Sequence, residues 1–401
     1  VPVSAGKMVK QLVQILFIYF GLLPDIAIMA IGLVFEQPVL AAIGCVVVNT
    51  LLGLVFFFLT PLFLEPKDGK KYAPERTFTG NLNEAKKHFS RLGLGTFVIL
   101  GLGAVVQILA MGVVDRVFPQ WMENSWGMWL ITFAPLYLIA VPVGLLLLRK
   151  VPAKPLEMHD LKPGRYIVSA IICIFMMYAG NILGTIITAL LQLLPGISAG
   201  NPILGYATDN ALLPKVLFMV ILAPVIEEYI FRKQLIDRMH IYGGKLAVIT
   251  SALMFGLFHG NLSQLFYAFA LGLVFGYVYL KTGKLRYSIG LHMLINFIGS
   301  VVGPFFLEKL AVLDTMETMD LAALEPILPW LLGFGAYVLV LIGLAVTGLV
   351  LLCINKRRVS FAPAELELPK ESCFKIVYVN VGMILLLVGC VALILANVIP
   401  L

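Results

Sequence analysis

Long apolar runs recur along the whole length of this sequence. Of its 401 residues, 60% are hydrophobic and only 13% are charged, whereas soluble domains carry about 25% charged residues. The runs are long enough to cross a bilayer as helices, and lipid offers no partner for an unpaired backbone group. We therefore expect an all-α polytopic membrane protein.

The runs divide into about eleven expected transmembrane helices. They lie near 11–34, 38–61, 92–114, 127–148, 166–194, 213–232, 245–260, 263–281, 286–307, 328–353 and 376–399. Of the 29 Lys and Arg residues, 26 lie before the first span or around alternate links. Because basic links stay in the cytoplasm, the N-terminus is expected there, and an odd span count places the C-terminus outside. This distribution explains the net charge of +7 without a nucleic-acid partner.

Polar residues within the spans divide the chain into three parts. Residues 1–160 are expected to form an N-terminal four-helix membrane extension. Residues 161–307 hold the polar motifs and are expected to form a catalytic membrane core, followed by a C-terminal two-helix extension at 308–401. The five cysteines form no C-x-x-C pair, so we expect neither a disulfide framework nor a cysteine metal site.

Two adjacent carboxylates, Glu227 and Glu228, are the most costly residues in these spans. A charged side chain at the bilayer centre costs roughly 2.5–3.5 kcal/mol on insertion scales. A chain keeps such a pair for chemistry, for ion movement or for a specific internal pairing. Two later spans supply polar partners, His259 on one and His292 with Asn296 on the next.

Spacing from the predicted turns places these groups at one depth. Gly243 and Gly244 form a turn signal, and Glu227 and His259 each lie 16 residues from Gly243. At 1.5 Å per residue, both are about 24 Å from that turn in an antiparallel hairpin. They could therefore share one water or one metal ion.

The next hairpin turns at Gly283, which puts His292 and Asn296 about 14 and 20 Å from its turn. These two residues are i,i+4 on one helix face and could hold a developing oxyanion. Glu228 and Arg232 are also i,i+4, with the acid first, which is the favourable order for an ion pair.

Such a set suits the activation of water. Glu227 can take a proton from a water that His259 orients, while His292 and Asn296 stabilise the tetrahedral intermediate of amide hydrolysis. Alternatively, Glu227, His259 and His292 are ligands of a divalent metal such as zinc that activates the water. The zinc-protease signature H-E-x-x-H does not occur.

At these residues the chain resembles the CPBP family of intramembrane proteases, which includes CAAX proteases and bacteriocin-processing enzymes and is also called Abi. The family pattern is E-E-x-x-x-R, then F-x-x-x-H, then H-x-x-x-N or D. The chain has all three in order, each on its own expected span: Glu227, Glu228 and Arg232; Phe255 and His259; His292 and Asn296. The resemblance covers roughly 160–305.

The resemblance implies an intramembrane endopeptidase that opens toward the cytoplasm. Glu227 looks like the water-activating base and His259 like its partner. His292 and Asn296 look like the oxyanion site, and the charged pair of the first motif looks like structural support. The implied substrate is a peptide or protein, with or without a lipid group, cut in contact with membrane lipid.

The family also suggests a setting and a cofactor requirement. Its eukaryotic members remove three residues from prenylated C-termini, whereas its distribution makes a bacterial cytoplasmic membrane the expected location here, where a prenylated substrate is not expected. Both metal-dependent and metal-free mechanisms have been assigned to the family. The lack of a cysteine or zinc-type motif favours no cofactor, and nothing in the sequence sets the oligomeric state.

Two other functions fit the same residues. A non-enzymatic bacteriocin-immunity or peptide-binding protein could use the same cavity, and its function would survive Glu227→Gln. An ion- or proton-coupled transporter could use intramembrane carboxylates and histidines as a relay. The clustering of the polar groups at one depth argues against a path across the membrane.

Overall fold

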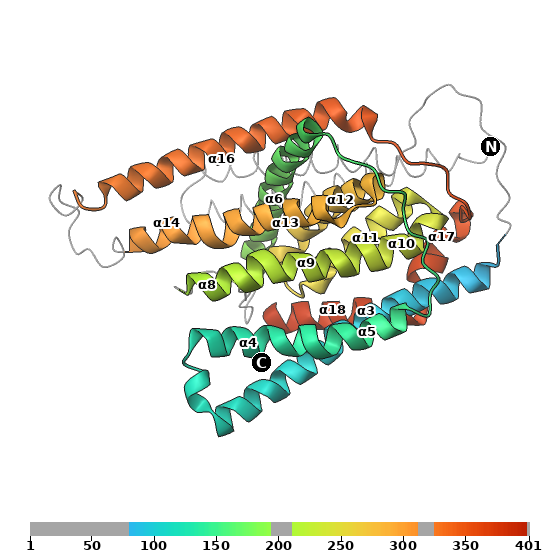
Figure 1. Cartoon of the computed structure of the whole chain (residues 1–401), viewed down its shortest axis with the longest axis horizontal. Helices are drawn as coiled ribbons and strands as arrows, with labels where there is room; N and C mark the ends of the chain where they lie inside the picture. Colours follow the sequence, from blue (N-terminus) through green and yellow to red (C-terminus); the bar gives the residue numbers. More distant parts are fainter. Residues whose placement is uncertain (1–79, 194–210, 312–324, 399–401) are drawn as a thin grey trace.

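The computed structural model of the chain describes residues 80–193, 211–311 and 325–398, where all regular structure is helical (Figure 1). The first part comprises α3 (Leu82–Val117), η1 (Pro119–Trp121), α4 (Ser125–Pro135), η2 (Leu136–Ala140), α5 (Val141–Leu148) and α6 (Pro163–Leu191). The middle part comprises α8 (Leu212–Lys215), η3 (Val216–Leu222), α9 (Ala223–Glu228), η4 (Tyr229–Ile236), α10 (Asp237–Met239), η5 (His240–Tyr242), α11 (Gly244–Phe258), α12 (Leu262–Thr282), α13 (Leu285–Phe297), η6 (Ile298–Val302) and α14 (Gly303–Leu310). The last part comprises α16 (Leu328–Asn355), η8 (Lys356–Arg358), α17 (Lys370–Tyr378) and α18 (Val381–Val398).

Seven helices in the described ranges are long and apolar enough to cross a membrane. They are Leu82–Val117, Ser125–Leu148, Pro163–Leu191, Leu262–Thr282, Leu285–Leu310, Leu328–Arg358 and Val381–Val398. The spans expected near 213–232 and 245–260 are also helical. However, the first contains the charged motif, and α11 has only 15 residues, fewer than the roughly 20 that a span needs.

The spans expected near 11–34 and 38–61 lie outside the described residues. The all-α class is therefore confirmed for the described part of the chain, while the count of eleven and the sides of the two termini stay predictions. The span expected near 376–399 begins later than predicted, because Asn380 separates α17 from α18. Its side chain donates to the carbonyl of Ile376 and accepts a hydrogen bond from the amide of Met383.

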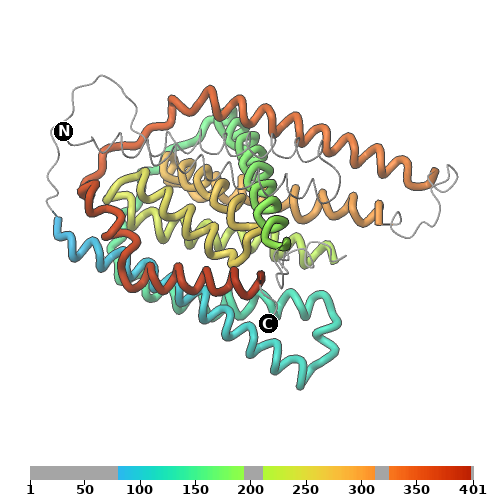
Figure 2. Tube along the Cα trace, turned by 180° about the vertical axis from the view of Figure 1, so that it is seen from behind, coloured from blue at the N-terminus to red at the C-terminus, as the bar shows by residue number. Residues whose placement is uncertain are grey.

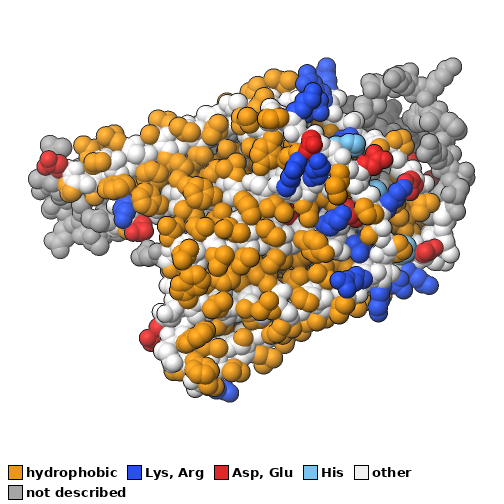
Figure 3. Space-filling view, viewed as in Figure 1, with side chains coloured by type: hydrophobic (Ala, Val, Ile, Leu, Met, Phe, Trp, Pro, Cys, Tyr) orange, Lys and Arg blue, Asp and Glu red, His pale blue; other side chains and the backbone are white. Residues whose placement is uncertain are grey.

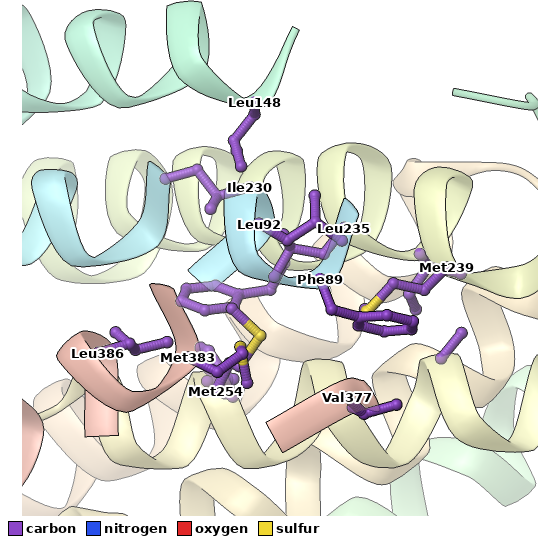
Figure 4. Close-up of a cluster of buried hydrophobic side chains, with 14 of the residues drawn as sticks. Phe89, Leu92, Leu148, Ile230, Leu235, Met239, Met254, Val377, Met383 and Leu386 are labelled. Atoms are coloured by element: carbon purple, nitrogen blue, oxygen red, sulfur yellow. The ribbon is translucent and has the colours of Figure 1, made fainter. Parts of the chain in front are cut away.

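Helices from all three parts of the sequence share one hydrophobic core. Figure 4 shows Phe89 and Leu92 of α3 beside Leu235 of η4, Met254 of α11 and Leu386 of α18. All five side chains are buried. Helix α18 lies along α3 in both ribbon views (Figure 2), and α6 crosses α12 and α16 steeply. The extensions therefore pack directly against the helices that carry the motifs.

The two hairpins of the middle part turn at the predicted glycines. Gly243 has φ 136° and Gly283 has φ 61°, backbone conformations that favour glycine. Helices α11 and α12 approach closely along the G-x-x-x-G sequence that holds Gly272 and Gly276. A Cβ on Gly272 would lie 3.0 Å from the Cα of Ala252.

Charged side chains gather at one end of the molecule. Figure 3 shows most Lys and Arg side chains toward the end where α10 and α17 lie, and apolar side chains over the rest of this face. At this end Arg238 donates from Nε to the carbonyls of Leu148 and Val151. The amide of Lys154 donates to the Asp237 carbonyl, 2.8 Å away. These bonds fix the link between α5 and α6 across the end of the core.

Candidate active site

The helix that carries the first motif is continuous from α8 to α10, but two π-helical segments, η3 and η4, interrupt it. Between them stands α9, which ends with Glu227 and Glu228. In η3 the amide of Ala223 bonds to the carbonyl of Phe218, five residues back. π-helical turns inside α-helices are frequent at functional sites. Glu227 and Glu228 therefore lie in a short α-helical segment between two wider π-helical segments.

Glu228 and Arg232 form the predicted ion pair. Arg232 Nε lies 3.0 Å from Glu228 Oε2, and both side chains are fully buried. The guanidinium also donates from Nη1 to Ser251 Oγ, and its carbon lies 4.7 Å from the centre of the Phe255 ring. Two opposite charges enclosed by hydroxyl and aromatic groups form a rigid base beneath Glu227.

His292 lies between the two carboxylates. Its Nδ1 is 3.2 Å from Glu228 Oε1, and its Nε2 is 3.6 Å from Glu227 Oε2. The imidazole stacks on Phe275, with 5.1 Å between ring centroids and an angle of 25° between the planes. The edge of the Phe255 ring closes a further side. This packing fixes the imidazole ring between the two glutamates.

Glu227 is the accessible member of the pair, with 24% of its side chain exposed. His259 follows the last residue of α11 and interacts electrostatically with both Glu227 and His292. A neighbouring pair agrees with the predicted equal heights of Glu227 and His259. Phe231 and Phe255, one turn nearer the hairpin turn, each lie 12 residues from Gly243, and their ring centroids are 5.2 Å apart. The structure thus brings His259 and Glu227 into one site.

The His259 ring is oriented by a backbone contact. Its Nδ1 lies 2.8 Å from the carbonyl oxygen of Phe255. A carbonyl only accepts hydrogen bonds, so Nδ1 carries the proton and donates. In the neutral ring Nε2 then has a free lone pair and can accept a proton or a hydrogen bond from water.

Asn296, one turn after His292 on α13, is tied to the helix of the first motif. Its Nδ2 donates to the Met219 carbonyl in η3, 2.8 Å away. In the π pattern that carbonyl would bond the amide of residue 224, but Pro224 has no N–H. Asn296 therefore replaces a missing backbone donor with one of its two amide protons and keeps the other.

Two tyrosines near Glu227 belong to no predicted motif. Tyr137 of η2 and Tyr267 of α12 both interact electrostatically with the Glu227 carboxylate. Tyr137 comes from the N-terminal extension, which the sequence placed outside the catalytic core. Only three-dimensional packing brings these residues to the site, so neither spacing nor a motif could have identified them.

A metal ion would need several side chains of the site to point at one centre. Among the residues that the structure describes, no group of three His, Cys, Asp or Glu side chains could hold a metal ion. Nδ1 of His259 faces a carbonyl, and the two nitrogens of His292 face different carboxylates. The alternative in which Glu227, His259 and His292 hold a divalent metal therefore stays a prediction.

Apolar helices that could span a membrane, together with a buried cluster of carboxylates and imidazoles, define a membrane protein with an internal polar site. Residues 209–298 match the family model described as Type II CAAX prenyl endopeptidase Rce1-like. This segment of the chain thus matches the CAAX protease family that its motifs predicted, and the apolar helices indicate an integral membrane protein. No curated protein matches the chain. No solved structure matches it either.

The family match coincides with the polar site. It begins near α8 and ends at the start of η6, so it includes every predicted site residue. Helices α3 to α6 and α16 to α18 lie outside it, although α3, α5, α17 and α18 contribute to the core that supports the site.

Proposed function

We propose that this protein is an intramembrane endopeptidase that hydrolyses a peptide bond with a water activated by Glu227. The observation that supports it most is the position of Glu227. It is a partly exposed carboxylate beside His259 and above a neutralised, fully buried Glu228–Arg232 pair. A general base needs access to water and a fixed orientation, and this arrangement offers both.

The reaction follows from the orientation of the two groups. His259 accepts a hydrogen bond from the water at Nε2, while Glu227 takes one of its protons. The hydroxide adds to the carbonyl carbon of the scissile bond. When the tetrahedral intermediate collapses, the C–N bond breaks, and protonated Glu227 returns its proton to the leaving nitrogen.

His292 and Asn296 are proposed as the oxyanion donors. Nε2 of His292 lies 3.6 Å from Glu227 Oε2, so an N–H at this nitrogen would lie on the Glu227 side. It can serve there with the free amide proton of Asn296 as an oxyanion donor.

The substrate is proposed to be a peptide or protein, with or without a lipid group, that reaches the site from the cytoplasm. Glu227 lies 12 residues from Met239, which is about 18 Å along the helix from the basic end. If that basic end faces the cytoplasm, as the positive-inside rule predicts, the site opens within its half of the bilayer. We propose a bacterial cytoplasmic membrane as the location.

The test is cleavage of quenched peptide libraries, with and without a farnesyl group, by the purified full chain in nanodiscs. Glu227→Gln and His259→Ala should abolish cleavage while the thermal unfolding midpoint is retained. Glu308→Gln and His159→Ala are the matched controls, because both residues are exposed and distant from the site in sequence and contacts. They should cleave like wild type.

Each other outcome supports a different reading. Cleavage that a chelator stops and zinc restores would make Glu227, His259 and His292 metal ligands after all. Binding of a library peptide without cleavage, unchanged in Glu227→Gln, would favour the peptide-binding or immunity function and would contradict the protease.

A further inference from the structure

A chain of side-chain hydrogen bonds starts beside His259. In the turn between α11 and α12, Asn261 Nδ2 donates to the carbonyl of His259, 2.8 Å away, and to Gln264 Oε1, 2.7 Å away. Gln264 Nε2 then donates to the hydroxyl of Tyr267, again over 2.8 Å. The chain ends at a phenol that interacts electrostatically with Glu227. It therefore connects the surroundings of the two residues proposed to activate water.

The direction of donation along this chain is fixed by the backbone. Asn261 Oδ1 accepts from the amide of Gln264 over 2.9 Å, so its amide nitrogen must face the His259 carbonyl. That nitrogen then donates to Gln264 Oε1, which leaves Gln264 Nε2 as the donor to Tyr267. A flipped Gln264 would put two donors face to face. The Tyr267 oxygen is thus an acceptor toward Gln264, and its own proton points elsewhere.

The backbone of Tyr267 is held as firmly as its hydroxyl. Helix α6 passes so close that a Cβ on Gly180 would lie 2.4 Å from the Tyr267 Cα. The ring packs against both large hydrophobic clusters of the described residues. The backbone and the hydroxyl oxygen of Tyr267 therefore have fixed partners. Among the contacts of the described residues, the O–H proton has no acceptor.

We propose that the Tyr267 hydroxyl is a hydrogen-bond donor of the active site, which binds the carbonyl oxygen of the scissile peptide bond as it becomes an oxyanion. This inference rests on the proposed protease function. The step needs no proton transfer, since the O–H bond stays intact while the developing negative charge strengthens the hydrogen bond. The other donors proposed for that role are partly used, because Asn296 already donates one of its two amide protons to the Met219 carbonyl and both nitrogens of His292 face carboxylates. A phenol with an uncommitted proton adds a further donor.

The test compares Tyr267→Phe with wild type in nanodiscs, on farnesylated and unmodified quenched peptide libraries. Removal of one preorganised oxyanion donor should lower kcat by on the order of 100-fold, with KM changed little. Tyr337→Phe is the matched control, since it removes a membrane-embedded hydroxyl that bonds to the Ile298 carbonyl away from Glu227. It should leave kcat unchanged.

A second variant separates donation from packing. Trifluorotyrosine at position 267 keeps the ring and hydroxyl but makes the phenol more acidic, so the donating form should be lost at lower pH. The alkaline limb of the pH–rate profile should therefore move to lower pH, which a purely structural tyrosine would not cause. An unmoved limb overturns the proposal, as does a Tyr267→Phe variant with wild-type kcat.

Glu227→Gln in the same assay keeps the two proposals apart. If Glu227→Gln is inactive while Tyr267→Phe cleaves normally, the role of Tyr267 fails and the protease function stands. If Glu227→Gln cleaves like wild type, or if wild type cleaves neither library, the protease function fails and the role of Tyr267 falls with it.

Discussion

The Asn296 side chain donates a hydrogen bond to the Met219 carbonyl, 2.8 Å away, and so joins the third motif to the helix of the first. The contact exists because Pro224, five residues after Met219, has no N–H to fill that position in the π-helical pattern. In lipid a carbonyl left without a donor costs free energy, so a neighbouring side chain must replace the missing one. Asn296 thus has a structural task besides any catalytic one.

A double-mutant cycle separates the two tasks. Asn296→Ala should destabilise the protein by about 1–3 kcal/mol, because it orphans the Met219 carbonyl. Pro224→Ala in that background returns an amide N–H and should recover most of the loss, measured as the free energy of unfolding. Recovered stability without recovered cleavage would establish the oxyanion role. If cleavage also returns, Asn296 acts only through packing.

Removing one partner of the buried Glu228–Arg232 pair should destabilise the protein more than replacing both partners. Arg232→Met leaves Glu228 charged and enclosed, which should destabilise by about 3–5 kcal/mol, whereas Arg232→Met with Glu228→Gln should cost clearly less. Unfolding of the three forms measures this difference. The exposed pair Lys309–Glu308 is the comparison, and its removal should change stability by at most about 1 kcal/mol. Equal costs for the single and double variants would contradict the prediction.

The sequence predicted the depth of the site residues and the Glu228–Arg232 ion pair, but not their other partners. Distance from Gly243 and Gly283 sets height along a helix, and the Phe231–Phe255 and Phe275–His292 contacts agree with that register. Lateral neighbours depend on tertiary packing, which spacing does not encode. His292 was expected either to form an oxyanion site with Asn296 or to share a metal ion with Glu227 and His259. The structure places it between the two glutamates, with one ring nitrogen toward each.

The π-helical segments are a second feature that the sequence alone could not predict. Pro224 was visible in the sequence, but whether a helix accommodates a proline by kinking, widening or ending depends on the donors nearby. The tyrosines at Glu227 come from helices far away in the chain, one of them in the N-terminal extension. The motifs could therefore locate the site but not complete its lining.

The link before α6 should respond to acid. Hydrogen bonds from Lys284 and Tyr287, with the charge of Lys284, lower the pKa of Asp160, which lies outside the membrane spans. A carboxyl whose pKa is lower in the folded state stabilises the fold above its unfolded pKa, and that contribution disappears as the pH falls through the folded value. Asp160→Asn should therefore lower the thermal midpoint slightly at pH 7, and the difference from wild type should vanish in acid. A difference that grows in acid would contradict this sign.

The last prediction concerns α18, which lies outside the family match. Asn397 donates from Nδ2 to the carbonyl of Gly260 over 3.1 Å, next to His259. Asn397→Leu removes this bond at similar volume, and a misplaced His259 could cost up to about 100-fold in kcat. Kinetics with the libraries measure this loss, and Leu395→Ala on the exposed face of α18 is the control. Full activity of Asn397→Leu would show that α18 only packs against the core. Reduced kcat with an unchanged unfolding midpoint would make the C-terminal helix part of the catalytic unit, because the turn that carries His259 depends on it.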